Sequence, residues 1–109
     1  MARKLVDTLE DKKGENIVLM DIQNVSSFTD YFILCNGSSD RMLKALVDAV
    51  DDTARSQFKL KGKIEGIPES GWVILDLGDI IVHLMSEDLR NFYRIEDLWS
   101  EGKTLVRLQ

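Results

Sequence analysis

The stretch that decides the fold is GWVILDLGDIIVHLMSEDLRNFYRIEDLW, residues 71–99. Two apolar runs, 72–77 and 80–85, flank the pair Gly78-Asp79, which favours antiparallel strands joined by a tight turn. Ser86 then precedes two acidic residues, as at the start of a helix, and aromatic and apolar residues follow at helical spacing. The stretch predicts a β-hairpin that leads into a short aromatic helix.

The residues before this stretch predict two more helices and three more strands. The expected elements are a helix over 3–13, apolar strands over 17–20 and 31–35, a helix from about 39 to 57, and a weak edge strand over 60–65. Ser38 or Ser39 can cap the long helix after the turn at Asn36-Gly37. Apolar runs without polar alternation are typical of strands covered on both faces.

This order of elements predicts an α/β fold in a single domain over residues 1–109. Its mixed sheet has about five strands and is flanked by helices. Residues 100–109 receive no element and are treated as a tail that can be loosely ordered.

The charge balance is acidic, with 14 basic and 19 acidic residues and a net charge of −5. An acidic domain is poorly suited to neutralise a phosphate backbone and better suited to a basic partner. The only basic cluster, residues 58–63, has three lysines and one aromatic ring, too few to indicate RNA recognition. An RNA-binding adaptor, which would bind RNA with a steep salt dependence, is therefore disfavoured, and no sequence-specific nucleic acid is expected.

The chain is expected to be cytoplasmic. Its sole cysteine, Cys35, cannot form an internal disulfide, and the N-terminal residues do not form a secretory signal. No apolar run approaches the roughly 20 residues that a membrane-spanning helix needs, so no membrane is expected as a partner.

A nucleotide-transfer site is one candidate. The segment Asn36-Gly37-Ser38-Ser39, between a strand and a helix, resembles the Gly-Ser signature of nucleotidyltransferases. That chemistry also needs paired carboxylates for a divalent metal, and lysines stand at 61 and 63 where such acids would be expected. A capped turn is favoured, and the alternative kept is a metal-dependent nucleotidyltransferase or phosphohydrolase that uses Ser38, Asp76 and Asp79.

The only histidine, His83, is a second candidate. Strand alternation places it on one face with Ile81 and Met85. It has neither a nucleophile nor a second metal ligand at a familiar spacing, so no catalytic residue, metal or cofactor is predicted. We expect a structural or surface histidine bonded to a neighbouring carboxylate, and Asp76 could lie across the hairpin from it.

A protein-binding face is the third candidate. Trp72, Ile74 and Asp76 alternate onto one side of their strand, and the face that holds His83 can lie beside them. Aromatic, aliphatic and thioether side chains with isolated polar groups match the core of a protein interface. The sequence leaves open whether a helix of the same chain covers this face.

These segments resemble the ribosomal silencing factor family, also called the Iojap family. The resemblance rests on DYFI at 30–33 with NGSS at 36–39, EG at 65–66, GWVILD at 71–76, GDIIVH at 78–83, RNFY at 90–93 and LW at 98–99. The matching motifs cover nearly the whole chain in order. Leu77 and Met85 stand where aromatic residues are frequent in the family, which bears on how aromatic the binding face is.

The resemblance implies a nucleotidyltransferase-like fold without catalytic acids. It also implies binding to the large ribosomal subunit through the universal ribosomal protein L-fourteen. This would block joining to the small subunit and repress translation when nutrients are scarce. The contact residues expected are Trp72, Ile74, Asp76, Asp79, Ile81, His83 and Met85, with Asp30 and Tyr31 at the rim. A weak homodimer is expected when no ribosome is present, because self-association would hide an apolar face.

Overall fold

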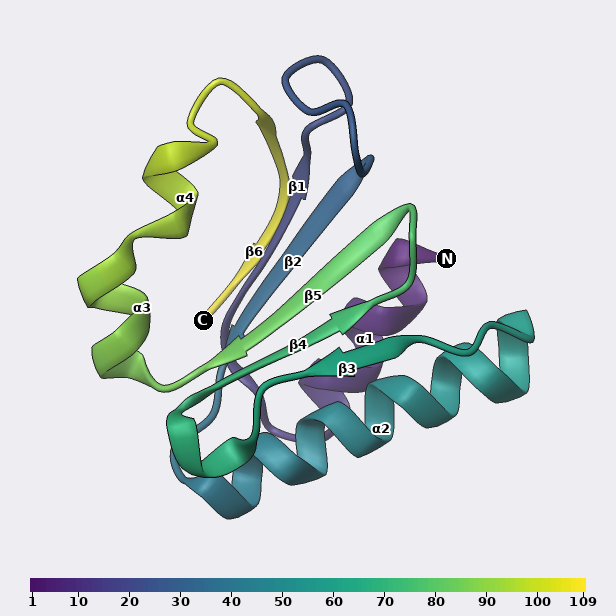
Figure 1. Ribbon diagram of the computed structural model, residues 1–109, viewed down its shortest axis with the longest axis vertical. Helices are drawn as coiled ribbons and strands as arrows, with labels where there is room; N and C mark the ends of the chain where they lie inside the picture. Colours follow the sequence, from purple (N-terminus) through teal and green to yellow (C-terminus); the bar gives the residue numbers. More distant parts are fainter.

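One six-stranded sheet separates two groups of helices in the computed structural model, which describes all residues from 1 to 109 (Figure 1). The strands lie in the order β3-β4-β5-β2-β1-β6. Their bounds are β1 Glu15–Asp21, β2 Tyr31–Asn36, β3 Lys63–Glu65, β4 Trp72–Asp76, β5 Ile80–Met85 and β6 Lys103–Leu108. The helices are α1 Ala2–Asp11, α2 Asp40–Phe58, α3 Glu87–Tyr93 and α4 Ile95–Leu98, with a short 3₁₀ turn η1 at Pro68–Ser70.

The sheet is mixed, as predicted. β2 and β5 pair in parallel, and every other neighbouring pair is antiparallel. The hairpin of β4 and β5 forms where the sequence predicts it, with Gly78 in the left-handed region at φ 88°. Ser39 and Ser86 cap α2 and α3 by accepting the backbone N–H groups of Met42 and Leu89.

The sheet has one strand more than the sequence predicts, because β6 forms within the residues treated as a tail. It pairs antiparallel with β1, so that Arg107 lies opposite Val18 and Val106 opposite Leu19. β6 is an edge strand with mostly exposed side chains, and such a strand lacks the apolar pattern that marks an interior one. Gly102 permits the turn into β6, because a Cβ there would meet Ile22 Cγ2 at 2.8 Å.

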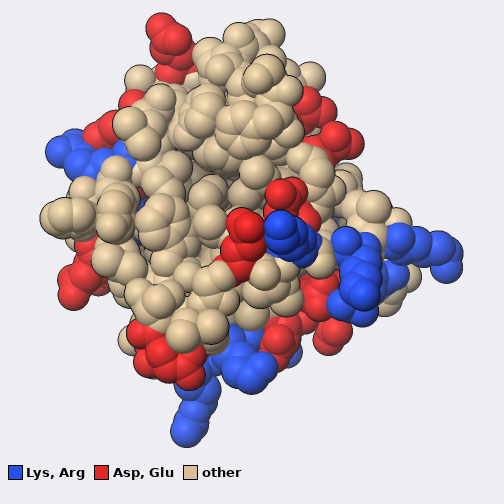
Figure 2. Space-filling model, in the orientation of Figure 1, with Lys and Arg blue, Asp and Glu red and all other residues tan.

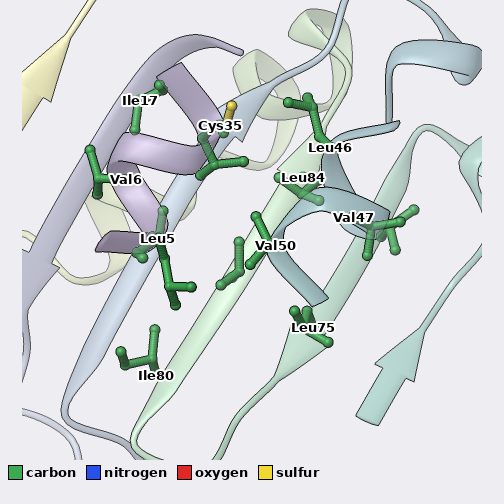
Figure 3. Packing of buried hydrophobic residues seen from close by; sticks show 14 of the residues in the cluster. Leu5, Val6, Ile17, Cys35, Leu46, Val47, Val50, Leu75, Ile80 and Leu84 are labelled. Atoms are coloured by element: carbon green, nitrogen blue, oxygen red, sulfur yellow. The ribbon is translucent and has the colours of Figure 1, made fainter. Parts of the chain in front are cut away.

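The larger core lies between the sheet and the helices α1 and α2, which are behind the sheet in Figure 1. Figure 3 shows Leu5 of α1 and Leu46 and Val50 of α2 pointing toward strand residues such as Leu84. Their apolar stripes repeat at helical spacing, so each helix buries one face and keeps the other in solvent. None of the helices is long and apolar enough to cross a membrane.

The opposite face of the sheet has a smaller core and thinner cover. Its buried members are Val18, Met20, Ile22, Phe32, Leu34, Met85 and Ile95. α3 contributes only one buried side chain, Arg90, and α4 only Ile95. Both helices lie toward the β6 side of the molecule, and no helix crosses β4 and β5 on this face (Figure 1). Part of the sheet therefore faces solvent directly.

Candidate protein-docking face

The hairpin places its predicted contact residues on the thinly covered side of the sheet. Cross-strand register pairs Trp72 with Met85, Ile74 with His83, and Asp76 with Ile81. Because side chains alternate along a strand, all of these point to the face that carries α3 and α4. Trp72 and Ile81 pack against the smaller core there. We call this surface the docking face.

Fewer of the hairpin residues reach the surface of the docking face than the sequence indicates. Met85 is fully buried and His83 is 7% exposed, so both lie beneath the surface. Trp72, Ile74 and Asp76 remain partly exposed, as does Ile81. Alternation therefore predicts correctly that these six side chains lie on one side of the sheet, and four of the six are accessible at its surface.

Asp79, Asp30 and Tyr31 do not form the rim of this face. The backbone oxygen of Asp79 accepts the N–H groups of Asp30 and Tyr31, each at 3.0 Å, where the hairpin meets β2. The side chain of Tyr31 packs against the α1–α2 core, because it has the same strand parity as Ile33. The three residues line a hollow of about 320 Å³ with the start of α1. The expected grouping of all nine residues on one face is therefore corrected.

A row of aromatic rings crosses the docking face, and sequence reasoning missed it. Its members, in spatial order, are Phe28, Trp99, Phe32, His83, Trp72, Tyr93 and Phe92. Neighbouring ring centroids are 5.0–6.0 Å apart, within the range of favourable aromatic pairs. The rings come from three separate stretches of the chain, residues 28–32, 72–83 and 92–99, so their aromatic character was the only sequence signal.

Both ends of this row are open to solvent. Phe28 is 59% exposed and Phe92 is 76% exposed, and Leu98 of α4, which precedes Trp99 in the chain, is also 76% exposed. Figure 2 shows a broad uncharged area on this side of the molecule, with most charged side chains near its border and on the β3 side. A large apolar patch with a polar border is typical of a protein interaction site.

His83 is held by Trp72 and not by a carboxylate. The indole Nε1–H of Trp72 donates to His83 Nδ1 at 3.2 Å. Burial lowers the pKa of His83 to about 4, so the ring is neutral at physiological pH. The expected carboxylate partner is wrong because Asp76 lies opposite Ile81, and its Oδ1 accepts the Gly78 N–H at 2.8 Å.

A clasp centred on Arg90 attaches α3 and α4 to the sheet. Arg90 Nε donates to Glu96 Oε1 at 2.8 Å, and Nη1 donates to Asn36 Oδ1 at 3.1 Å and to the backbone oxygen of Asn16. Burial would raise the pKa of Glu96, but the hydrogen bond and charge of Arg90, with a smaller contribution from Arg107, lower it overall. The clasp holds α3, which carries Tyr93 of the aromatic row, and α4, which ends directly before Trp99.

The residues of the enzymatic alternative do not converge. Ser38 follows the end of β2, whereas Asp76 and Asp79 lie at the turn before β5. β2 and β5 run in parallel with Tyr31 beside Ile80, so these residues are at opposite ends of the sheet, roughly 20 Å apart by strand length. No three His, Cys, Asp or Glu side chains are grouped where they could hold a metal ion. Ser38 and the two acids therefore cannot act at one centre in this fold.

Comparison with known proteins identifies the family. The sequence model described as "Ribosomal silencing factor during starvation" matches residues 1–109. The chain belongs to the ribosomal silencing factor family. Among its relatives, ribosomal silencing factor RsfS of Bacillus subtilis is 37% identical over 85% of this chain and 79% of its own length. RsfS of Haemophilus influenzae is 38% identical over 88% of this chain and 94% of its own length.

The fold agrees with this family. A crystal structure from Chromobacterium violaceum has a TM-score of 0.85 and 32% sequence identity to this silencing factor, and the match covers 91% of this chain and 82% of that one. The family resemblance predicted from the motifs is confirmed, and so is the mixed α/β architecture. Ribosomal silencing is a regulatory role, which is consistent with a surface that binds another macromolecule.

Proposed function

We propose that this silencing factor binds the large ribosomal subunit through the universal ribosomal protein L-fourteen and prevents the small subunit from joining. The observation that carries the proposal is the open aromatic face of β4 and β5 in a chain of this family. The proposed contacts are Trp72, Ile74, Asp76 and Ile81, with Phe28, Phe92 and Leu98 extending the surface.

The negative net charge of the chain supports a basic binding partner. The chain carries a net charge of −5, and ribosomal proteins that neutralise RNA are commonly basic. Opposite charges raise the rate of encounter, while the apolar centre of an interface supplies most of the binding free energy. Binding of this kind slows at high salt but persists because the aromatic contacts remain.

The proposed mechanism is steric and needs no chemistry. The folded chain measures 34 × 34 × 23 Å, large enough to cover a contact surface between two subunits. A body of this size on L-fourteen would exclude the small subunit from the same place. Translation would fall in nutrient-poor conditions without damage to either subunit, and removal of the factor would restore joining.

The first test is co-sedimentation of the purified protein with large subunits, small subunits and joined ribosomes. We expect pelleting with large subunits only, and fewer joined ribosomes when the protein is added before the small subunit. Ile81→Glu should abolish pelleting, because it places a charge at the apolar centre. Pelleting with small subunits alone, or normal joining at saturating protein, would contradict the proposal.

We also propose that the free protein forms a weak homodimer through the same face. Exposed Phe28, Phe92 and Leu98 would be partly hidden by self-association. Sedimentation velocity at high micromolar concentration should show a dimer that Ile81→Glu disrupts. Purely monomeric behaviour at that concentration would contradict the proposed dimer but not the proposed binding to the ribosome.

A further inference from the structure

His83 contains the one buried side-chain nitrogen or oxygen in the chain that has no hydrogen-bond partner. This atom is Nε2. The ring lies beneath the docking face, between Phe32 and Trp72, with centroid distances of 5.0 and 6.0 Å. A buried polar atom left unpaired destabilises a fold, so its retention in this position calls for an explanation.

The tautomer of His83 follows from its contact with Trp72. An indole N–H can only donate, so Nδ1, which receives it at 3.2 Å, must be the unprotonated nitrogen. A neutral imidazole then carries its proton on Nε2. The unpaired atom is therefore an N–H donor, fixed in direction by the bond on the other side of the ring.

Nothing in the free protein satisfies this donor well. Phe32 meets the His83 ring at an interplanar angle of 74°, and an aromatic ring is at best a weak acceptor for an N–H group. The neighbouring carboxylate, Asp76, is engaged with Gly78 in the hairpin turn. The fold thus keeps a directed donor under the surface and leaves the acceptor to be supplied from outside.

We propose that the Nε2–H of His83 is a recognition donor, which has no acceptor within the chain and donates to a carbonyl oxygen of the docked protein. This inference rests on the proposed function and names the chemistry of its central contact. A neutral carbonyl fits better than a carboxylate, because the surrounding rings and aliphatic side chains could not compensate a buried charge. A protein fits better than RNA, because the face is apolar and the chain is acidic.

Access requires only a side-chain movement. Trp72 and Ile81 are partly exposed on the same face, and no helix crosses β5 on this side of the sheet (Figure 1). If Ile81 turns aside while Trp72 keeps its hydrogen bond to Nδ1, an incoming carbonyl can approach Nε2 while water is excluded by the same contact. A hydrogen bond formed in such a dry site discriminates strongly between partners that have the acceptor and those that lack it.

The test compares His83→Phe with His83→Gln in binding to purified large subunits. Phenylalanine fills the site without a donor, so binding should weaken about tenfold or more because the partner's carbonyl is left unpaired. Glutamine offers an amide N–H and should stay closer to wild type. Thermal unfolding should show that His83→Phe is as stable as the wild type, which separates recognition from a structural role.

A spectroscopic measurement decides the tautomer independently of these variants. Nitrogen-15 NMR of the wild-type ring should place the proton on Nε2, and this proton should shift downfield when purified L-fourteen is added. Three results would each overturn the inference and leave the proposed function standing. They are a proton on Nδ1, an unchanged resonance in the complex, and wild-type affinity of folded His83→Phe. Failure of the wild type to bind large subunits would instead overturn the proposed function, and the inference with it.

Discussion

Arg90 of α3 donates through Nη1 to Oδ1 of Asn36 at the end of β2, over 3.1 Å. Arg90 is the only buried side chain of α3, and its hydrogen bonds add to the apolar contacts that Leu89 and Tyr93 make with the sheet side of the fold. The same guanidinium donates through Nε to Glu96 of α4. One side chain therefore links α3 and α4 to the sheet beside the docking face.

Arg90→Met should destabilise the fold by about 3 kcal/mol, because it leaves Glu96 and Asn36 without their buried partner. The midpoint and slope of urea unfolding provide the measurement. Arg94→Ala is the matched control, since Arg94 pairs with Asp97 at the surface and its loss should cost below about 1 kcal/mol. Equal effects of the two substitutions would show that the Arg90 clasp contributes no more than an exposed ion pair.

Stability should fall as pH drops from 6.5 toward 4 because of His83. Its pKa is about 4 in the folded protein and 6.5 ordinarily, so the unfolded chain binds the proton first. The free energy of unfolding should decrease by about 2 kcal/mol between pH 7.5 and pH 5. His83→Phe should flatten this part of the profile, and an unchanged slope would show that His83 is not buried in its neutral form.

Glu96 acts in a lower pH range. Its pKa lies below the ordinary value of 4.5 in the folded protein, so its contribution to stability is present above that value and is lost as pH falls through the folded pKa. Glu96→Gln should therefore reduce stability at pH 7 and leave a shallower acid transition below pH 4.5. An acid transition identical to that of the wild type would mean that other carboxylates cause it.

Cys35 should be inert to thiol reagents in the folded protein. Burial raises the pKa of its thiol to about 12, against a weaker lowering effect of the Arg90 charge, and its side chain is fully buried. Reaction with a disulfide reagent at pH 8 should be slower than in urea by at least about a hundredfold, limited by opening of the fold. Rapid labelling under native conditions would indicate that the core around Cys35 opens readily.

Asp76 should contribute to docking through its charge and to the hairpin through its oxygen. Asp76→Asn keeps an acceptor for the Gly78 N–H and removes the charge, whereas Asp76→Lys removes both. We expect both to weaken large-subunit binding, the lysine variant more strongly, with about 1 kcal/mol lost in stability only for lysine. Asp52→Lys, the same charge change on exposed α2, should bind normally, and equal weakening by it would point to net charge alone.

Local sequence patterns were sufficient to predict the elements whose residues have a clear spacing or capping signal. The hairpin over 72–85, the serine caps of α2 and α3, and the apolar stripes of α1 and α2 all form where they are predicted. Strand alternation also placed Trp72, Ile74 and Ile81 on one side of the sheet. These features depend on spacing along the chain, which the sequence contains directly.

Tertiary structure alone decided how deep each residue lies and which distant residues meet. Alternation cannot tell that Met85 is buried while Trp72 and Ile74 on the same face stay partly exposed, because depth depends on what packs against that face. β6 exists because β1 offers an unpaired edge, and the aromatic row and the Arg90 clasp join segments far apart in the chain. Contacts of this kind arise only when the whole chain has folded, since their free energy is shared among residues that have no local pattern in common.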